Sequence, residues 1–240
     1  MLKKLRKMVT VLFLIIAMVV GMLPAFPADT VKAANLIDEA EMTRRVKDLA
    51  VRCGLNADLS KSDGVYFTKS GGTCCGSNDC KNCRAENVLS IDSAFVKNFE
   101  FSKVSASLLP HHYGTTSGYT TQGASCVGFA NFALWYVGKD DNMTNLEPLS
   151  NVRKIEQGIL FNEANLRALD LKIGDVICVR GPKSNHSMMF LGYEKKGIKV
   201  LDCNWQYTMG EDKVRIRIHT CSYTSSFYSG RNMGVTRLAH

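Results

Sequence analysis

Five short apolar segments in the second half of the chain constrain its fold more than any other feature. They are rich in β-branched or apolar residues, turns of Gly, Pro, Ser or Lys separate them, and they span residues 174–180, 186–193, 198–205, 213–220 and 233–239. Short segments with this composition and punctuation predict β-strands. A helix followed by such a series predicts an α+β fold, in which the helix packs on an antiparallel sheet.

The helix is expected in the stretch GASCVGFANFALWYVGK, residues 123–139. Ser125 would be its N-cap and Gly138 its end, and apolar residues recur along one face at spacings of three and four: Val127, Ala130, Leu134 and Val137. Cys126 would then lie in the first turn. There the helix dipole and the unpaired backbone N–H groups favour a thiolate, the form of cysteine that attacks carbonyl groups. The alternative is a buried structural cysteine.

The first residues have the layout of a secretory signal peptide. Basic residues precede an apolar run that extends to about residue 26, and prolines lie at the end of this run. Val31 and Ala33 suit cleavage after Ala33. The alternative is an uncleaved membrane anchor, since the run approaches the length that spans a bilayer. Either way we expect an exported protein, secreted or associated with the cell wall, whose only membrane contact would be through this segment.

The charge that remains after cleavage is small. Residues 1–33 contain five basic residues and one acidic residue, so their removal lowers the formal net charge from +8 to +4. This charge favours either loose association with anionic wall polymers or ordinary solubility. The sequence has no stripe of Lys and Arg interleaved with aromatic residues, so a nucleic-acid partner is not expected.

The number of cysteines is odd: Cys53, Cys74, Cys75, Cys80, Cys83, Cys126, Cys178, Cys203 and Cys221. In an exported protein we expect eight of them to pair in disulfides and the ninth to be a free thiol. Residues 74–83 hold four cysteines in a polar loop, and a zinc knuckle is the alternative there. Zinc sites separate their two cysteine pairs, whereas Cys74 and Cys75 are adjacent, so we expect disulfides and no metal or cofactor.

An amphipathic helix is expected before that loop, in NLIDEAEMTRRVKDLAVRCGL, residues 35–55, with Gly54 as its stop. The chain would therefore consist of a signal peptide (1–33), a helix with a stapled cysteine-rich loop (34–105) and a domain with the Cys126 helix and the five strands (106–240).

Three polar residues are expected to converge at the sheet. Alternation along residues 198–205 puts Asp202 and Asn204 on one face and Leu201 and Cys203 on the other. His186 opens the preceding strand, and a hairpin turn at residues 194–197 would bring it towards this pair.

Other notable residues are expected to have structural or surface positions. His111 and His112 would lie in an exposed loop, His219 at the surface of a strand and Asp175 in the turn before one. Trp135 and Trp205 are expected in the core or in a cleft wall.

With these residues the chain resembles the CHAP family of cysteine amidases and peptidases and, more distantly, the NlpC-type wall peptidases, both of which are papain-like. In those families a Cys that begins a helix is followed by a Gly-Asp-Val strand, by a His that opens the next strand and by a polar residue on the third strand. The matching positions here are Cys126, residues 174–176, His186, and Asp202 with Asn204. The resemblance covers about residues 109–240 and implies a papain-like fold, with the Cys-bearing helix packed on an antiparallel sheet or half-barrel.

The resemblance also implies a cysteine hydrolase that cleaves amide bonds in peptidoglycan peptides, as an amidase or an endopeptidase. Cys126 would be the nucleophile, His186 the general base, and Asp202 the residue that orients it, with Asn204 close enough to share that role. CHAP members usually carry Gln directly before the Cys, where this chain has Ser125, so the expected donors of the oxyanion hole are the Cys126 N–H and Gln122. The alternatives are a secreted cysteine peptidase or transferase that acts on proteins, and a catalytically inactive, disulfide-stapled binding module.

Overall fold

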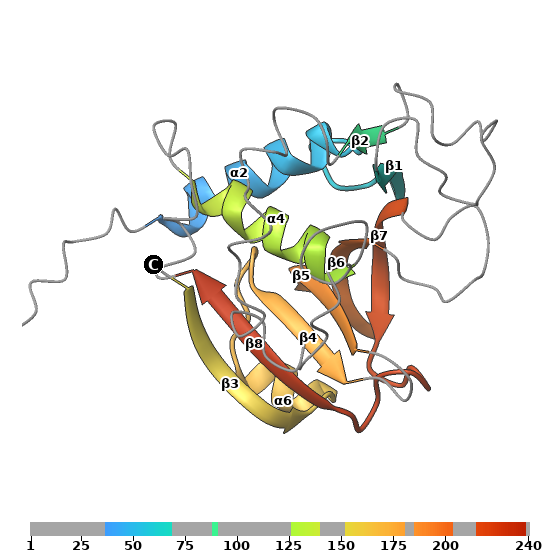
Figure 1. Cartoon of the computed structure of the whole chain (residues 1–240). Helices are drawn as coiled ribbons and strands as arrows, with labels where there is room; N and C mark the ends of the chain where they lie inside the picture. Colours follow the sequence, from blue (N-terminus) through green and yellow to red (C-terminus); the bar gives the residue numbers. More distant parts are fainter. Residues whose placement is uncertain are drawn as a thin grey trace, which may run out of the picture. The chain divides into compact units, whose positions relative to one another are not determined.

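The computed structural model describes residues 37–68, 88–90, 126–139, 152–180, 185–203 and 215–238 (Figure 1). The chain separates into two units, Met1–Asn35 and Leu36–His240, and all described residues belong to the second. Within these ranges, no helix has the length and apolar character needed to cross a membrane. The predicted signal peptide, the cysteine cluster at residues 74–83 and the predicted boundary between residues 105 and 106 lie outside the described ranges.

The described part of the chain has an α+β fold built on one eight-stranded sheet, as the sequence predicts. The strand order is β2-β1-β7-β6-β5-β4-β8-β3, and all neighbours are antiparallel except the parallel pair β1 and β2. The strands are β1 (Asp63–Thr68), β2 (Val88–Ser90), β3 (Val152–Leu160), β4 (Val176–Arg180), β5 (Asn185–Tyr193), β6 (Gly197–Cys203), β7 (Arg215–Ser222) and β8 (Asn232–Leu238).

The five strands expected from the sequence are β4 to β8, and their existence and antiparallel pairing are confirmed. The predicted hairpin turn between β5 and β6 is also present, because the backbone N–H of Glu194 donates to the carbonyl of Gly197 at 2.9 Å. The strands β1, β2 and β3 and the short helix α6 (Glu163–Ala168) were not expected, and β1 and β2 lie in the part of the chain predicted to be a helix followed by a cysteine-rich loop. β3 is an edge strand whose sequence, VRKIEQGIL, mixes charged and apolar residues, so it lacks the apolar signal of a central strand.

The helix that carries Cys126, α4 (Cys126–Gly138), is buried all round. Every residue from Cys126 to Val137 is buried, so the expected one-sided apolar stripe understates the apolar character of this helix. The reason is that α4 lies between two layers: β5 and β6 contact it on one side and α2 (Glu39–Arg52) on the other (Figure 1). A helix covered in this way has no solvent-facing side. Trp135 belongs to this core, as predicted.

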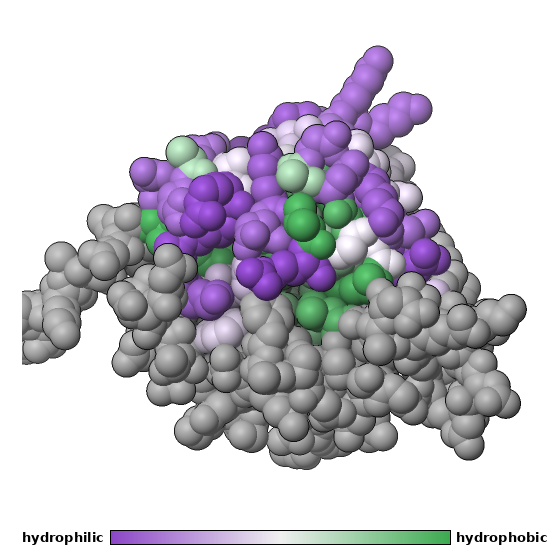
Figure 2. Space-filling model, turned by 90° about the horizontal axis from the view of Figure 1, so that it is seen from above, coloured by the Kyte–Doolittle hydropathy of each residue, from purple (hydrophilic) through white to green (hydrophobic). Residues whose placement is uncertain are grey.

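The amphipathic helix α2 forms the outer layer, as predicted. The Asp38 carboxylate caps it by accepting from the backbone N–H of Glu41 at 2.7 Å, and four apolar residues are buried beneath it: Met42, Val46, Leu49 and Ala50. Gly54 follows the helix with φ +72°, where a Cβ would meet Val65 at 2.7 Å, which explains the predicted stop. Seen from above, the described part of this face is mostly hydrophilic (Figure 2).

Polar contacts also fasten α2 to α4. The guanidinium of Arg45 donates to the carbonyl of Val137 at 3.1 Å and to that of Lys139, at the C-terminal end of α4. The Tyr136 hydroxyl donates to the Asp48 carboxylate. A cation at a helix C-terminus satisfies carbonyls that lack partners within the helix. These contacts hold α4 on the sheet from its outer side.

The sheet separates two apolar cores. One lies between the sheet and the two helices and takes Leu201 and Cys203 from β6, and the other lies on the opposite face and takes Ile198 and Val200. This is the period-two alternation of a strand. It puts Asp202 on the face of the second core, opposite to the neighbours Leu201 and Cys203.

Asp175 is a buried ion-pair partner rather than only the turn residue expected. It is 1% exposed, and Arg237 of β8 binds both carboxylate oxygens, Nε to Oδ1 at 2.8 Å and Nη2 to Oδ2 at 2.6 Å. Gly174 before it has φ +92°, a conformation that favours glycine. The pair therefore fixes the turn that leads into β4 to the neighbouring strand β8.

We expect Asp175→Ala to destabilise the fold strongly, because it removes the carboxylate that pairs with the partly buried Arg237 and leaves that guanidinium with the Asp170 carbonyl as acceptor. The loss in free energy of unfolding should be about 3–5 kcal/mol, measured by urea titration. The matched control is Glu163→Ala, which removes a half-exposed partner of Arg167 and should cost less than about 1 kcal/mol. Equal losses in the two variants would contradict the structural role of the buried pair.

Candidate active site

His186 and Asp202 meet on one face of the sheet. His186 lies at the start of β5 and Asp202 near the end of β6, and both are buried. Phe190 and Val200 are cross-strand partners, and each site residue is an even number of positions from one of them, so the two side chains share a face. His186 Nε2 lies 2.6 Å from Asp202 Oδ2. Because an ionised carboxylate only accepts, Nε2–H is the donor, which leaves Nδ1 for another partner.

Cys126 meets this pair from the first residue of α4. Its thiol is hydrogen-bonded with the His186 ring and lies 3.8 Å from the backbone carbonyl of Asn185, the residue before the histidine. Its side chain is buried, and the start of a helix adds a partial positive charge next to the sulfur. The structure thus brings three of the predicted site residues, Cys126, His186 and Asp202, into one connected set.

The histidine and the carboxylate stabilise each other's charged forms. Burial opposes a charge on His186, but the charge and hydrogen bond of Asp202 outweigh it and raise the pKa of the imidazole to about 10. Burial also opposes the charge on Asp202, yet the charge of His186 and the hydrogen bonds of His186 and His219 lower the pKa of the carboxyl to about 2. Asp202 is therefore ionised and His186 protonated at neutral pH.

The charged pair also affects the pKa of the Cys126 thiol. Burial would raise the pKa of its thiol, but the hydrogen bond and the positive charge of His186, with the backbone N–H of Ser187, lower that pKa below its usual value. The negative charge of Asp202 acts weakly in the opposite direction. The balance favours a thiolate–imidazolium pair, the reactive form of a cysteine nucleophile.

The pKa values of the other described cysteines are shifted in the opposite direction. Burial raises the pKa of each of them: Cys53, Cys178, Cys203 and Cys221. All five described cysteines are reduced, so the expectation that eight of nine pair in disulfides is wrong. Each of the four lies in an apolar core and serves as a small core residue there. Cys126 is thus distinguished by its electrostatic surroundings and not by being the odd cysteine.

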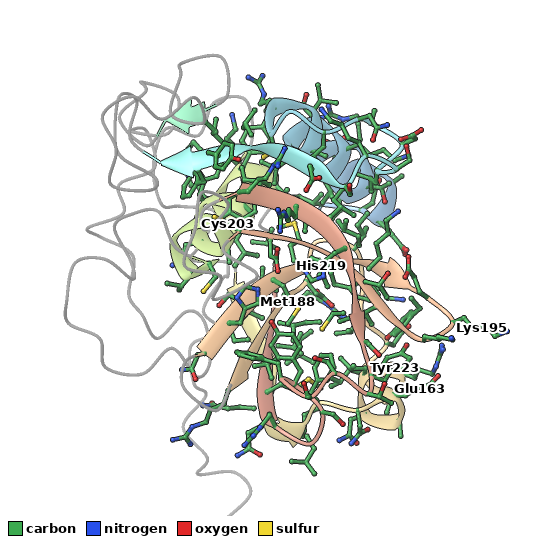
Figure 3. The ribbon with its side chains drawn as sticks, turned by 90° about the vertical axis from the view of Figure 1, so that its right-hand side faces the viewer. Glu163, Met188, Lys195, Cys203, His219 and Tyr223 are labelled. Atoms are coloured by element: carbon green, nitrogen blue, oxygen red, sulfur yellow. The ribbon has the colours of Figure 1, made fainter. Side chains whose placement is uncertain are left out.

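His219 belongs to the site, and the expectation that it is a surface residue is wrong. Its side chain is 17% exposed, and its Nε2 lies 2.9 Å from Oδ2 of Asp202. In Figure 3 it lies among the strands, whereas Lys195 of the β5–β6 turn projects from the edge. A signal was present in the sequence, because alternation along β7 puts Arg217 and His219 on the same face of that strand. What was missing was the register, in which Asp202 pairs with Arg217 and Val200 with His219.

An aromatic residue covers the other side of the histidine. The ring of Tyr228 stacks on that of His186 with 6.0 Å between centroids and 25° between planes. Tyr228 is 1% exposed and lies in the turn region between β7 and β8. The stacked ring restricts the orientation of the imidazole and keeps water from this side of it.

The remaining predicted residues lie outside the described ranges. These are Asn204, which follows the end of β6, the cap Ser125, the suggested oxyanion donor Gln122, Trp205, and the loop residues His111 and His112. The four clustered cysteines at residues 74–83 lie outside as well, so the choice between disulfides and zinc there stays a prediction. Among the described residues, no group of three or more His, Cys, Asp or Glu side chains could hold a metal ion.

Comparison with known proteins adds no relative: no protein-family model, no curated protein and no solved structure matches this chain.

We predict that Cys126 reacts with iodoacetamide before any other described cysteine. At neutral pH it should be alkylated about tenfold faster or more, because its lowered pKa keeps a thiolate that the buried thiols lack. Peptide mapping by mass spectrometry after a short pulse identifies the labelled residue. The fast phase should be absent in Cys126→Ala and retained in Cys178→Ala. Earlier labelling of a different described cysteine in the native protein would contradict the assignment.

The pH dependence of this alkylation should shift upwards in Asp202→Asn. The substitution removes the charge that raises the pKa of His186, so that pKa falls and less imidazolium is left to stabilise the thiolate. The pKa of Cys126 should then rise by about one unit or more, seen as a shift of the alkylation profile to higher pH. Asp170→Asn, which changes an exposed carboxylate, is the control. A downward shift would mean that direct repulsion between Asp202 and the thiolate dominates.

Proposed function

We propose that this protein is an exported cysteine hydrolase of papain-like type that cleaves amide bonds in peptidoglycan peptides. The observation that carries the proposal is the connected set of Cys126, His186 and Asp202. Of the five described thiols, only that of Cys126 has a lowered pKa. Perturbed pKa values of this kind, with a named partner for each, are typical of catalytic groups. A purely structural thiol needs neither an imidazolium partner nor an orienting carboxylate.

The chemistry follows from the protonation states. The Cys126 thiolate attacks the carbonyl carbon of the scissile amide, and the C=O electron pair moves onto oxygen. The backbone N–H of Cys126, at the start of α4, is one donor to that oxyanion. The His186 imidazolium gives its proton to the leaving nitrogen as the C–N bond breaks, and a thioester remains on Cys126.

Water completes the reaction. Neutral His186 takes a proton from the attacking water molecule, whose oxygen adds to the thioester carbonyl. The C–S bond breaks, the acid product leaves, and the thiolate–imidazolium pair is restored. Asp202 holds the imidazole through its Nε2–H and stabilises the positive charge that forms in both steps.

The architecture of the described residues supports the papain-like assignment. The cysteine begins a buried helix that packs on an antiparallel sheet, and the histidine and the carboxylate lie on two adjacent strands of that sheet. This order and arrangement agree with the resemblance to the CHAP family. Peptidoglycan as the substrate follows from that resemblance and from the expected export of the chain. A protein substrate, or an amine in place of water as acceptor, would use the same thioester.

We expect the purified protein to release new amino groups from peptidoglycan. Mass spectrometry of the digest would identify the scissile bond, and Cys126→Ala should release nothing. Release from a protein substrate instead of peptidoglycan would replace the substrate but keep the chemistry. No release from either, with Cys126 still the fastest-reacting thiol, would leave a reactive thiol without the proposed hydrolase function.

The three polar residues should contribute unequally to turnover. His186→Ala should abolish measurable activity, and Asp202→Ala should lower kcat by about four orders of magnitude, as loss of the orienting carboxylate does in serine proteases. Asn204→Ala should cost about tenfold, close to 1.4 kcal/mol. Each variant is compared with Thr220→Ala, an exposed neighbour on β7. If Asn204→Ala were crippling and Asp202→Ala mild, the residue that orients His186 would be Asn204.

A further inference from the structure

One oxygen atom of Asp202 receives both imidazoles of the described site. Oδ2 lies 2.6 Å from Nε2 of His186 and 2.9 Å from Nε2 of His219. The other oxygen, Oδ1, is buried and has no hydrogen-bond partner among the described residues. The carboxylate itself is 0% exposed. Its hydrogen bonds to the described part of the chain therefore converge on a single atom.

Both bonds have the same polarity. A carboxylate oxygen only accepts, so each histidine donates its Nε2–H, and this fixes the hydrogen on Nε2 in His219 as it does in His186. The two donors come from strands on opposite sides of β6, since β5 pairs with one edge of β6 and β7 with the other. A carboxylate held from one side only can turn about its Cβ–Cγ bond. One held from both sides cannot turn without losing a bond.

We propose that His219 is a positioning residue, which holds the Asp202 carboxylate in the orientation that directs His186 towards Cys126. It acts through Asp202 and touches no reacting atom. The inference rests on the proposed nucleophilic role of Cys126, and it adds a second histidine, from a separate strand, to the three groups already described.

The surroundings argue against a role in packing alone. His219 pairs across the strands with Val200, and the same face of β6 and β7 continues with Ile198 and Cys221, which are buried in the second core. An aliphatic residue at position 219 would extend this core and would avoid the cost of burying a polar ring. The imidazole of His219 instead directs its N–H donor at the buried carboxylate of Asp202. Such a donor stabilises the carboxylate, because a buried anion is costly unless donors surround it.

The consequences of losing His219 can be followed along the chain of contacts. Without this donor the Asp202 carboxylate is less well stabilised as an anion and less restricted in orientation, so it supports the His186 imidazolium less well. The thiolate of Cys126 then loses part of its counter-charge. The other titratable or charged groups near these residues are Arg217, the cross-strand partner of Asp202, with Asp63 paired to it, and Cys203, Cys221 and Tyr228.

The test compares His219→Ala with His219→Gln in the full chain. The Gln side chain carries an N–H donor near the position of Nε2, whereas Ala carries none. The rate of Cys126 alkylation by iodoacetamide is measured as a function of pH. At neutral pH we expect about a tenfold decrease in His219→Ala and a rate within about threefold of wild type in His219→Gln. Well above pH 8.5 the rates should converge, because an unassisted thiol then ionises by itself.

Controls separate positioning from folding and from the proposed reaction. Urea unfolding shows whether each variant is folded at the temperature of the assay, and Thr220→Ala, the exposed neighbour on β7, should leave the pH profile unchanged. If turnover of peptidoglycan is found, kcat should fall about tenfold or more in His219→Ala with KM unchanged, since His219 does not contact the substrate.

A folded His219→Ala variant with the wild-type pH profile would overturn the inference. So would a His219→Gln variant that is as impaired as His219→Ala at matched stability, because it would make the ring and not its N–H the important feature. The failure of the proposed hydrolase has a different signature: no amide cleavage by the wild type, whatever the alkylation profile of these variants.

Discussion

The buried carboxylate of Asp202 is the group on which the rest of the site depends. An anion without access to water is stable only if hydrogen-bond donors and opposite charge surround it. Here two imidazole N–H groups meet one of its oxygens, and the charge that results on His186 is what favours the thiolate of Cys126. The protonation states of the three side chains are therefore one coupled property, and each would have a different pKa if either of the others were removed.

The fold supplies the fixed distances that this coupling needs. The histidine and the carboxylate lie on adjacent strands in the middle of an eight-stranded sheet, where neighbours on both sides hold the register. The cysteine begins a helix that is buried between the sheet and a second helix, and the contacts of Arg45 with the far end of α4 fasten it there. Small movements of α4 would separate the thiol from the imidazole, so α2 contributes to the site without touching it.

The five described cysteines differ in role: one belongs to the candidate site and four are structural. Four of them are packed in apolar cores, where burial keeps the neutral thiol and makes it a poor nucleophile. Cys178 contacts the Ser187 hydroxyl at 3.0 Å, and no described residue gives it an imidazolium partner of the kind that Cys126 has. The difference in chemistry among five buried cysteines is therefore set by a single neighbouring imidazolium and by the start of a helix.

The sequence by itself determined the elements that have a strong local signal. The helices α2 and α4, the strands β4 to β8 and the turn between β5 and β6 follow from apolar periodicity, caps and turn residues, all of which act over a few positions. The candidates Cys126, His186, Asp202 and Asn204 also came from the sequence: a helix start and the alternation of strands placed them, and the resemblance to the CHAP family suggested their roles.

The tertiary structure decided what depends on contacts distant in sequence. The edge strand β3 has little apolar signal and exists because β8 pairs with it. The arithmetic of cysteines failed because burial, which no count of cysteines reports, makes a thiol as suitable for the core as a disulfide. His219 and Asp175 were assigned to the surface and to a turn because their partners, Asp202 and Arg237, lie 17 and 62 positions away. Only the register of the sheet brings those residues together, since the energy of each contact depends on pairings that local sequence does not specify.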